Sequence, residues 1–183
     1  MGALRPFFIR FLEVFMGKKT RLITYGAIIA ALYVALTYLQ NILVPGSASM
    51  AIQFRVSEAL CVLALYTPAA IPGLTIGCLL FNIGFAGALL LDFAVGTLAT
   101  LLAVSGMYAL RNVKIKSYPL PSMLLPAVSN AFLVGWELSV YIGGGFWLNA
   151  LYVAIGELTV LLTLGTALYY TLSARKLDKR LFS

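Results

Sequence analysis

Five ionisable residues interrupt the apolar stretches of this chain, and they are the first candidates for chemistry. They are Arg55, Glu58, Asp92, Glu137 and Glu157. Arg55 and Glu58 are three residues apart, a spacing at which side chains on one helical face can pair, so a purely structural ion pair is one interpretation. The other three carboxylates have no basic residue near them in the sequence. We expect these side chains to converge on a hydrated pocket for a ligand rich in hydrogen-bond donors.

Neutral polar and aromatic side chains near these charges extend the candidate site. Gln53, Asn82 and Asn149 can orient a ligand because an amide group both donates and accepts hydrogen bonds. Trp136 and Trp147 lie beside polar residues and can form flat walls around an aromatic ligand. An interfacial aromatic belt, which needs no ligand, is the alternative for the two tryptophans.

The segments that position these side chains read as membrane-spanning helices. Of 183 residues, 62% are hydrophobic and 10% charged, and the mean hydropathy is +0.98, whereas about a quarter of the residues in soluble domains are charged. We predict an all-α integral membrane protein with six spans, at 22–40, 56–66, 69–85, 89–110, 120–142 and 147–173. The second span is short and ends before Pro68, so one long helix broken at this proline is the alternative.

The positive charge is confined to three regions. Every Lys and Arg except Arg55 precedes residue 22, lies between 111 and 116, or follows 174. Six spans place these regions on one side, and the positive-inside rule makes that side cytoplasmic. Arg55, Glu58, Asp92 and Glu137 then lie in the outer half and Glu157 near the middle. The net charge of +7 is thereby explained by orientation and contact with the lipid bilayer, not by nucleic-acid binding.

The ends of the chain differ from the middle. Residues 1–19 combine aromatic side chains on one broad face with charges on another, which predicts an interfacial helix. Residues 20–174 form the predicted six-helix substrate-binding domain, and 175–183 form a basic cytoplasmic tail. Within the first span, Ala27, Ala31 and Ala35 repeat every four residues. Such stripes let helices approach closely in lipid, so we expect this one to bind a partner, either within the fold or on another protein.

Several classes of function lack their residues. The chain has no histidine, which excludes Ser-His hydrolysis and His-metal sites. It has no P-loop motif and only two cysteines, too few for a zinc site. We therefore expect no enzyme activity, no cofactor and no metal.

Four stretches resemble a known family. They are QFRVSEAL at 53–60, FNIGF at 81–85, LDFAVGTLAT at 91–100 and NAFLVGWEL at 130–138. They resemble the substrate-binding S components of energy-coupling factor (ECF) transporters, and among these the queuosine-precursor transporter (QueT) family, over about 22–173. The resemblance implies a multi-pass protein of the prokaryotic plasma membrane that captures its solute outside. It also implies docking, through the alanine stripe, to a transmembrane scaffold subunit with two ATPase subunits.

Under this resemblance the ligand is a 7-deazaguanine, namely queuine or its aminomethyl or cyano precursor. Glu137 and Glu157 are then candidates for the two donors of the guanine-like edge, and Glu58 and Asp92 for a cationic substituent or for Arg55. An S component for another flat vitamin-like solute is one alternative. A stand-alone secondary transporter or facilitator is another, although such proteins normally show an internal repeat, which this sequence lacks.

Overall fold

The described part of the chain is a bundle of helices. The structure is a computed structural model, and it describes residues 17–45, 47, 54–84 and 91–174, except for the side chain of Asp92. Apart from one isolated bridge between Ile115 and Tyr118, the regular structure in these ranges is helical, which confirms the predicted all-α class over this part. The helices are α2 (Lys18–Leu43), η1 (Val56–Leu65), α3 (Ala70–Gly84), α4 (Asp92–Ala109), α5 (Leu120–Tyr141), α6 (Phe146–Val160), η2 (Leu161–Gly165) and α7 (Thr166–Ala174).

The helices differ in their ability to cross a membrane. Among the described residues, three helices are long and apolar enough to span a bilayer by themselves: Lys18–Leu43, Leu120–Tyr141 and the continuous helix Phe146–Ala174. The segments Val56–Leu65, Ala70–Gly84 and Phe93–Ala109 are apolar but shorter. Each of the six predicted spans therefore corresponds to a helical segment. Residues 1–16 of the predicted interfacial segment 1–19 lie outside the described part of the chain, and so does the whole predicted tail 175–183.

The short second segment is the centre of the bundle. η1 is a 3₁₀-helix of ten residues, and it contacts every other helix of the described part. All of its residues except Val56 and Leu60 are buried, which suits a sequence that is apolar on all sides. A 3₁₀-helix rises about 2.0 Å per residue, so these ten residues extend about 20 Å, less than the ~30 Å hydrocarbon core.

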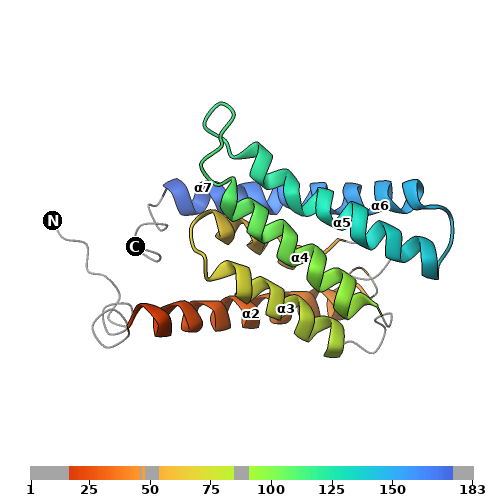
Figure 1. Cartoon of the computed structure of the whole chain (residues 1–183), viewed down its shortest axis with the longest axis horizontal. Helices are drawn as coiled ribbons and strands as arrows, with labels where there is room; N and C mark the ends of the chain where they lie inside the picture. Colours follow the sequence, from red (N-terminus) through yellow and green to blue (C-terminus); the bar gives the residue numbers. More distant parts are fainter. Residues whose placement is uncertain (1–16, 46, 48–53, 85–90, 175–183) are drawn as a thin grey trace.

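Figure 1 shows that the bundle has two distinct ends. The start of α2, the loop between α4 and α5 and the end of α7 lie together at one end, whereas the turn between α5 and α6 lies at the other. We call the first the basic end, because Lys18, Lys19, Lys114 and Lys116 lie there. We call the second the glycine end, because Gly143, Gly144 and Gly145 form its turn with φ angles of 82°, 80° and 84°. Glycine adopts this left-handed conformation without steric cost, which is why three glycines suit this turn.

A close contact between α2 and α3 fixes the rotation of α2. A Cβ on Gly73 would lie 2.7 Å from the carbonyl oxygen of Gly26, and one on Gly77 would lie 2.8 Å from the Cβ of Tyr33. Gly26, Ala30 and Tyr33 are therefore turned inward, and Ala27, Ala31 and Ala35 are exposed. The predicted stripe of three alanines is thus an outer surface of the described bundle.

Candidate functional site

Polar side chains from several helices meet in the middle of the bundle. Tyr33, Cys78 and Asn130 lie near the middle of their helices. Glu157 lies in the last turn of α6, near the middle of the continuous helix Phe146–Ala174. All four are buried. The hydrogen bonds and electrostatic interactions described below connect them to η1. We call this group the central polar cluster; its members are Tyr33, Arg55, Glu58, Cys61, Cys78, Asn130 and Glu157.

Glu58 anchors the cluster to α2. Its side chain is 1% exposed. The hydroxyl of Tyr33 donates a hydrogen bond to Oε1 of Glu58 at 2.7 Å, and the thiol of Cys61 donates to Oε2 at 3.1 Å. One turn away, the hydroxyl of Thr37 donates to Oγ of Ser57 at 2.7 Å. Both oxygens of the Glu58 carboxyl group therefore have donors, as burial of such a group requires.

Glu157 differs from Glu58, because only one of its two carboxyl oxygens accepts a hydrogen bond among the described residues. Nδ2 of Asn130 donates to Oε1 of Glu157 at 2.9 Å. Oε2 of Glu157 is buried and has no hydrogen-bond partner among the described residues. Leaving a buried acceptor unsatisfied costs about 1–3 kcal/mol, and more for a charged group. The arrangement therefore offers a fixed acceptor to a donor that enters the bundle.

Electrostatic interactions connect Glu157 to the charged residues at the start of η1. Glu157 on α6 interacts with Glu58 and with Arg55 at the start of η1. Arg55 is itself 7% exposed, so its guanidinium acts inside the bundle. Cys61 and Cys78 lie close enough to one another, and to Glu58, to interact electrostatically as well. The cluster thus contains one guanidinium and two carboxyl groups, and one of the carboxyl oxygens, Oε2 of Glu157, has no hydrogen-bond partner among the described residues.

The structure brings some of the predicted site residues together. Arg55, Glu58 and Glu157 meet in the central polar cluster, and Asn82 lies next to it because its Nδ2 donates to the sulfur of Cys78 at 3.5 Å. Arg55 and Glu58, the first charged residues of the second predicted span, are both buried. The reason is that η1 runs through the centre of the bundle, so its first turn is already covered by other helices.

Other predicted residues lie elsewhere. Glu137 is fully buried on α5, seven residues and thus about 10 Å beyond Asn130 toward the glycine end. Nδ2 of Asn149 donates to the carbonyl oxygen of Gly143 at 2.7 Å, so this amide closes the turn. Trp136 and Trp147 are 49% and 76% exposed; they do not enter the cluster, and their exposure matches an interfacial belt. Gln53 and the side chain of Asp92 lie outside the described parts of the structure.

Four members of the cluster were not among the residues predicted from sequence: Tyr33, Cys61, Cys78 and Asn130. Asn130 carried a signal, because an amide within an apolar helix indicates a buried partner. Tyr33 and Thr37 are four residues apart and share the inner face of α2, which was a detectable signal. The cysteines carried none, because a buried thiol is common in apolar cores, although the thiol of Cys61 donates to Glu58.

The path from the cluster toward the basic end is filled. Val62, Met107, Met123 and Leu172 belong to the main hydrophobic core there. Beyond them, tyrosine side chains pack on one another, and Tyr66 and Tyr169 stack with ring centroids 6.2 Å apart. Their hydroxyl groups are used internally: that of Tyr66 lies 2.8 Å from Oγ of Ser173, and that of Tyr118 lies 2.6 Å from Oγ1 of Thr166. The described residues at this end therefore form an apolar and aromatic plug.

No metal site accompanies the cluster in the described ranges, since no group of three or more His, Cys, Asp or Glu side chains there could hold a metal ion. The cluster offers hydrogen-bond donors and acceptors to a ligand.

Comparison with known proteins gives a family. The family model described as QueT transporter matches residues 23–174, which is most of the chain. The queuosine precursor transporter QueT of Lactococcus lactis subsp. cremoris (strain MG1363) is 41% identical over 91 residues, which cover 48% of this chain and 50% of the relative. The match therefore spans about half the length of that curated relative. No solved structure matches. The family model covers all the helices that build the central polar cluster, and we conclude that the chain belongs to the QueT transporter family.

Proposed function

We propose that this protein is the substrate-binding S component of an ECF importer and that it captures a queuosine precursor of the 7-deazaguanine class in the central polar cluster. The single observation that carries this proposal is the buried Oε2 of Glu157, which lacks a donor among the described residues. A deazaguanine brings donors on one flat edge, and family membership supports this ligand class. The relative's name, queuosine precursor transporter, points the same way.

The proposed contacts follow from the chemistry of each group. Glu157, held by Asn130, accepts from the N1–H and exocyclic amine of the guanine-like edge. Arg55 is the donor for the carbonyl oxygen of the ligand. Glu58, or Asp92 in its place, balances a cationic aminomethyl substituent. Glu137 is the second candidate for the guanine-like edge because it is also fully buried.

The proposed partner surface is the exposed stripe of Ala27, Ala31 and Ala35 on α2. In our proposal it docks on a transmembrane scaffold subunit that carries two ATPase subunits, in the plasma membrane of a prokaryotic cell. The plug at the basic end supports dependence on such a motor, because a stand-alone transporter needs a route through both halves of the protein. A filled inner half favours capture by this chain and release only after a driven rearrangement.

Binding and transport measured side by side test the proposal. The purified chain in proteoliposomes should bind radiolabelled 7-aminomethyl-7-deazaguanine and should show no uptake of it. Addition of the scaffold and ATPase subunits with ATP inside the vesicles should start uptake. Absence of saturable binding would refute the ligand class. Uptake by the chain alone would refute the motor-dependent mechanism and favour a stand-alone transporter.

A further inference from the structure

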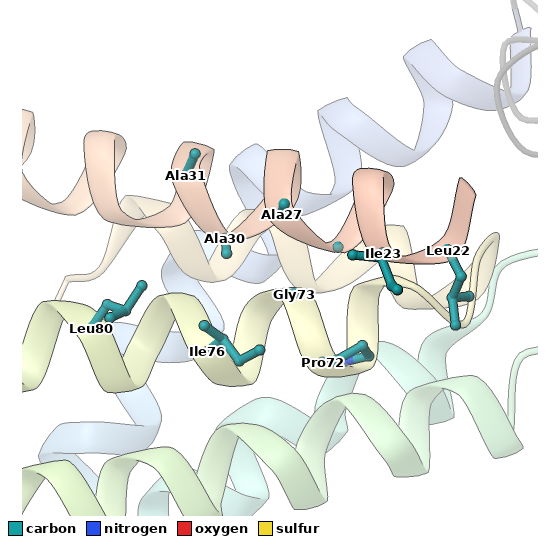
Figure 2. Close-up of a pocket in the computed structure, with 10 residues that line it drawn as sticks. Leu22, Ile23, Ala27, Ala30, Ala31, Pro72, Gly73, Ile76 and Leu80 are labelled. Atoms are coloured by element: carbon teal, nitrogen blue, oxygen red, sulfur yellow. The ribbon is translucent and has the colours of Figure 1, made fainter. Parts of the chain in front are cut away.

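A groove separates α2 from α3 on the outside of the bundle. Its volume is about 430 Å³, and Figure 2 shows it running along both helices. Every residue that lines it is apolar or glycine; among them are Leu22, Ile23, Ala27 and Ala31 on α2 and Ile76 and Leu80 on α3. Leu22, Ile23, Ile76 and Leu80 are between 41% and 70% exposed, so the groove opens toward the surroundings of the bundle.

The length of the groove matches one leaflet of a bilayer. It follows α2 from Leu22 to Ala31 and α3 from Pro72 to Leu80, which corresponds to about 12–14 Å at 1.5 Å per residue. Half of a ~30 Å hydrocarbon core is about 15 Å. The groove begins one turn from the start of α2, at the basic end, and ends near the middle of the bundle.

The lining of the groove suits a hydrocarbon chain. Every residue along it is apolar or glycine, so no side chain there offers a hydrogen bond. An occupant therefore gains only apolar contact. The acyl chains of lipids offer that contact along an outer surface of this length.

Charge at one end of the groove identifies the class of lipid. Lys18 and Lys19 are exposed in the first turn of α2, directly before Leu22, where the groove begins. We propose that the groove between α2 and α3 binds one acyl chain of an anionic phospholipid, whose phosphate contacts Lys18 and Lys19. Each basic residue near a membrane surface strengthens binding of anionic lipid about fivefold, so the pair should favour anionic over zwitterionic lipid by roughly twentyfold.

The lipid site overlaps the proposed docking stripe only in part. Ala27 and Ala31 line the groove, whereas Ala35, on the same stripe, does not. A substitution at Ala35 can therefore disturb a protein contact without filling the groove, and this separates the two kinds of occupant. The lipid inference does not depend on the identity of the transported solute.

Native mass spectrometry of the full chain tests the site. The protein is released from nanodiscs of equimolar phosphatidylglycerol and phosphatidylcholine, and retained lipid is counted. Wild type should retain one phosphatidylglycerol. Lys18→Gln with Lys19→Gln should reduce the ratio of retained phosphatidylglycerol to retained phosphatidylcholine about twentyfold, and Ala27→Leu, which fills the groove, should reduce the total retained lipid at least fivefold. The matched controls Lys114→Gln with Lys116→Gln, at the same end, and Ala94→Leu, on exposed α4, should retain the lipid.

Four results would overturn the proposal. The first is equal retention of both lipids by wild type. The second is equal retention of phosphatidylglycerol by the Lys18→Gln, Lys19→Gln variant and by its lysine control. The substitutions at Lys18 and Lys19 are at exposed residues and leave packing intact. The third is loss of the scaffold subunit with no loss of lipid in Ala27→Leu, which would assign the groove to a protein partner. Ala35→Leu should keep the lipid, and its loss there would also contradict the site.

Discussion

The two faces of α2 differ in chemistry although they belong to one helix. On the inner face, Tyr33 and Thr37 donate hydrogen bonds to Glu58 and Ser57 of η1 at 2.7 Å each. On the outer face, Ala27, Ala31 and Ala35 are exposed and leave a flat surface. The comparison teaches that one helix can hold a binding site in position while it leaves a smooth surface for a partner. It also predicts that changes on the two faces should affect different measurements.

The largest effect is expected on the outer face. Ala31→Leu adds bulk to a flat contact surface, and overpacking by 1–3 kcal/mol corresponds to a loss of about 5–150-fold in association with the scaffold subunit. Ligand binding should be unchanged because Ala31 points away from the cluster. Quantitative co-purification with the scaffold and ATPase subunits measures the first, and equilibrium dialysis the second. Unchanged co-purification would remove the stripe as the docking surface.

Tyr33→Phe removes the hydrogen bond that joins the inner face of α2 to Glu58. Oε1 of Glu58 would lose its donor within the bundle, and we expect a loss of about 1–3 kcal/mol in stability. A lower melting temperature in detergent, with weaker ligand binding, would show it. Tyr38→Phe is the matched control, since Tyr38 lies on the same helix and packs edge-on against Phe81. An equal effect of both substitutions would mean that the Tyr33 hydroxyl has no special role.

Gly77→Ala tests the close contact between α3 and the inner face of α2. Its new Cβ would lie 2.8 Å from the Cβ of Tyr33, so α2 and α3 must separate, at a cost of about 1–3 kcal/mol. Thermal unfolding of the variant should show this destabilisation. Gly17→Ala, where nothing lies within 4 Å of the added Cβ, is the control and should unfold as wild type does.

Thr37→Val should have the smallest effect. It removes one neutral hydrogen bond to Ser57, which contributes about 0.5–1.5 kcal/mol. Thr171→Val is the control, because the Thr171 hydroxyl is exposed and bonds only to its own helix. A variant as stable as this control would show that the Thr37–Ser57 bond adds nothing to the anchoring of η1.

The helical class and the location of the helices could be predicted from sequence because the hydropathy pattern determines both. The six predicted segments all correspond to helices. The depth of Arg55 and Glu58 was not accessible, because it depends on η1 running through the centre of the bundle. Nothing in VSEALCVLAL distinguishes a short central 3₁₀-helix from a short span at the edge.

Only part of the candidate site could be predicted from sequence, for a related reason. Charged residues in apolar segments are conspicuous, and Glu58 and Glu157 were selected on that basis. Their partners are not conspicuous: Tyr33 and Cys61 are common in membrane helices, and the pairing of Asn130 with Glu157 joins residues 27 positions apart. Conversely, Trp136 and Trp147 attract attention by type, but their surroundings at the surface decide their role.

The central claim is that Glu157 presents a buried acceptor to the solute, and one binding measurement tests it most directly. Affinity for 7-aminomethyl-7-deazaguanine should be measured by isothermal titration calorimetry for wild type, Glu157→Gln and Glu137→Gln. Loss of a charged hydrogen bond of about 1.5–3 kcal/mol predicts a Kd about 10–100-fold higher for Glu157→Gln, with a smaller change for Glu137→Gln. A wild-type Kd in Glu157→Gln, with a large loss in Glu137→Gln, would contradict the account and move the site toward the glycine end.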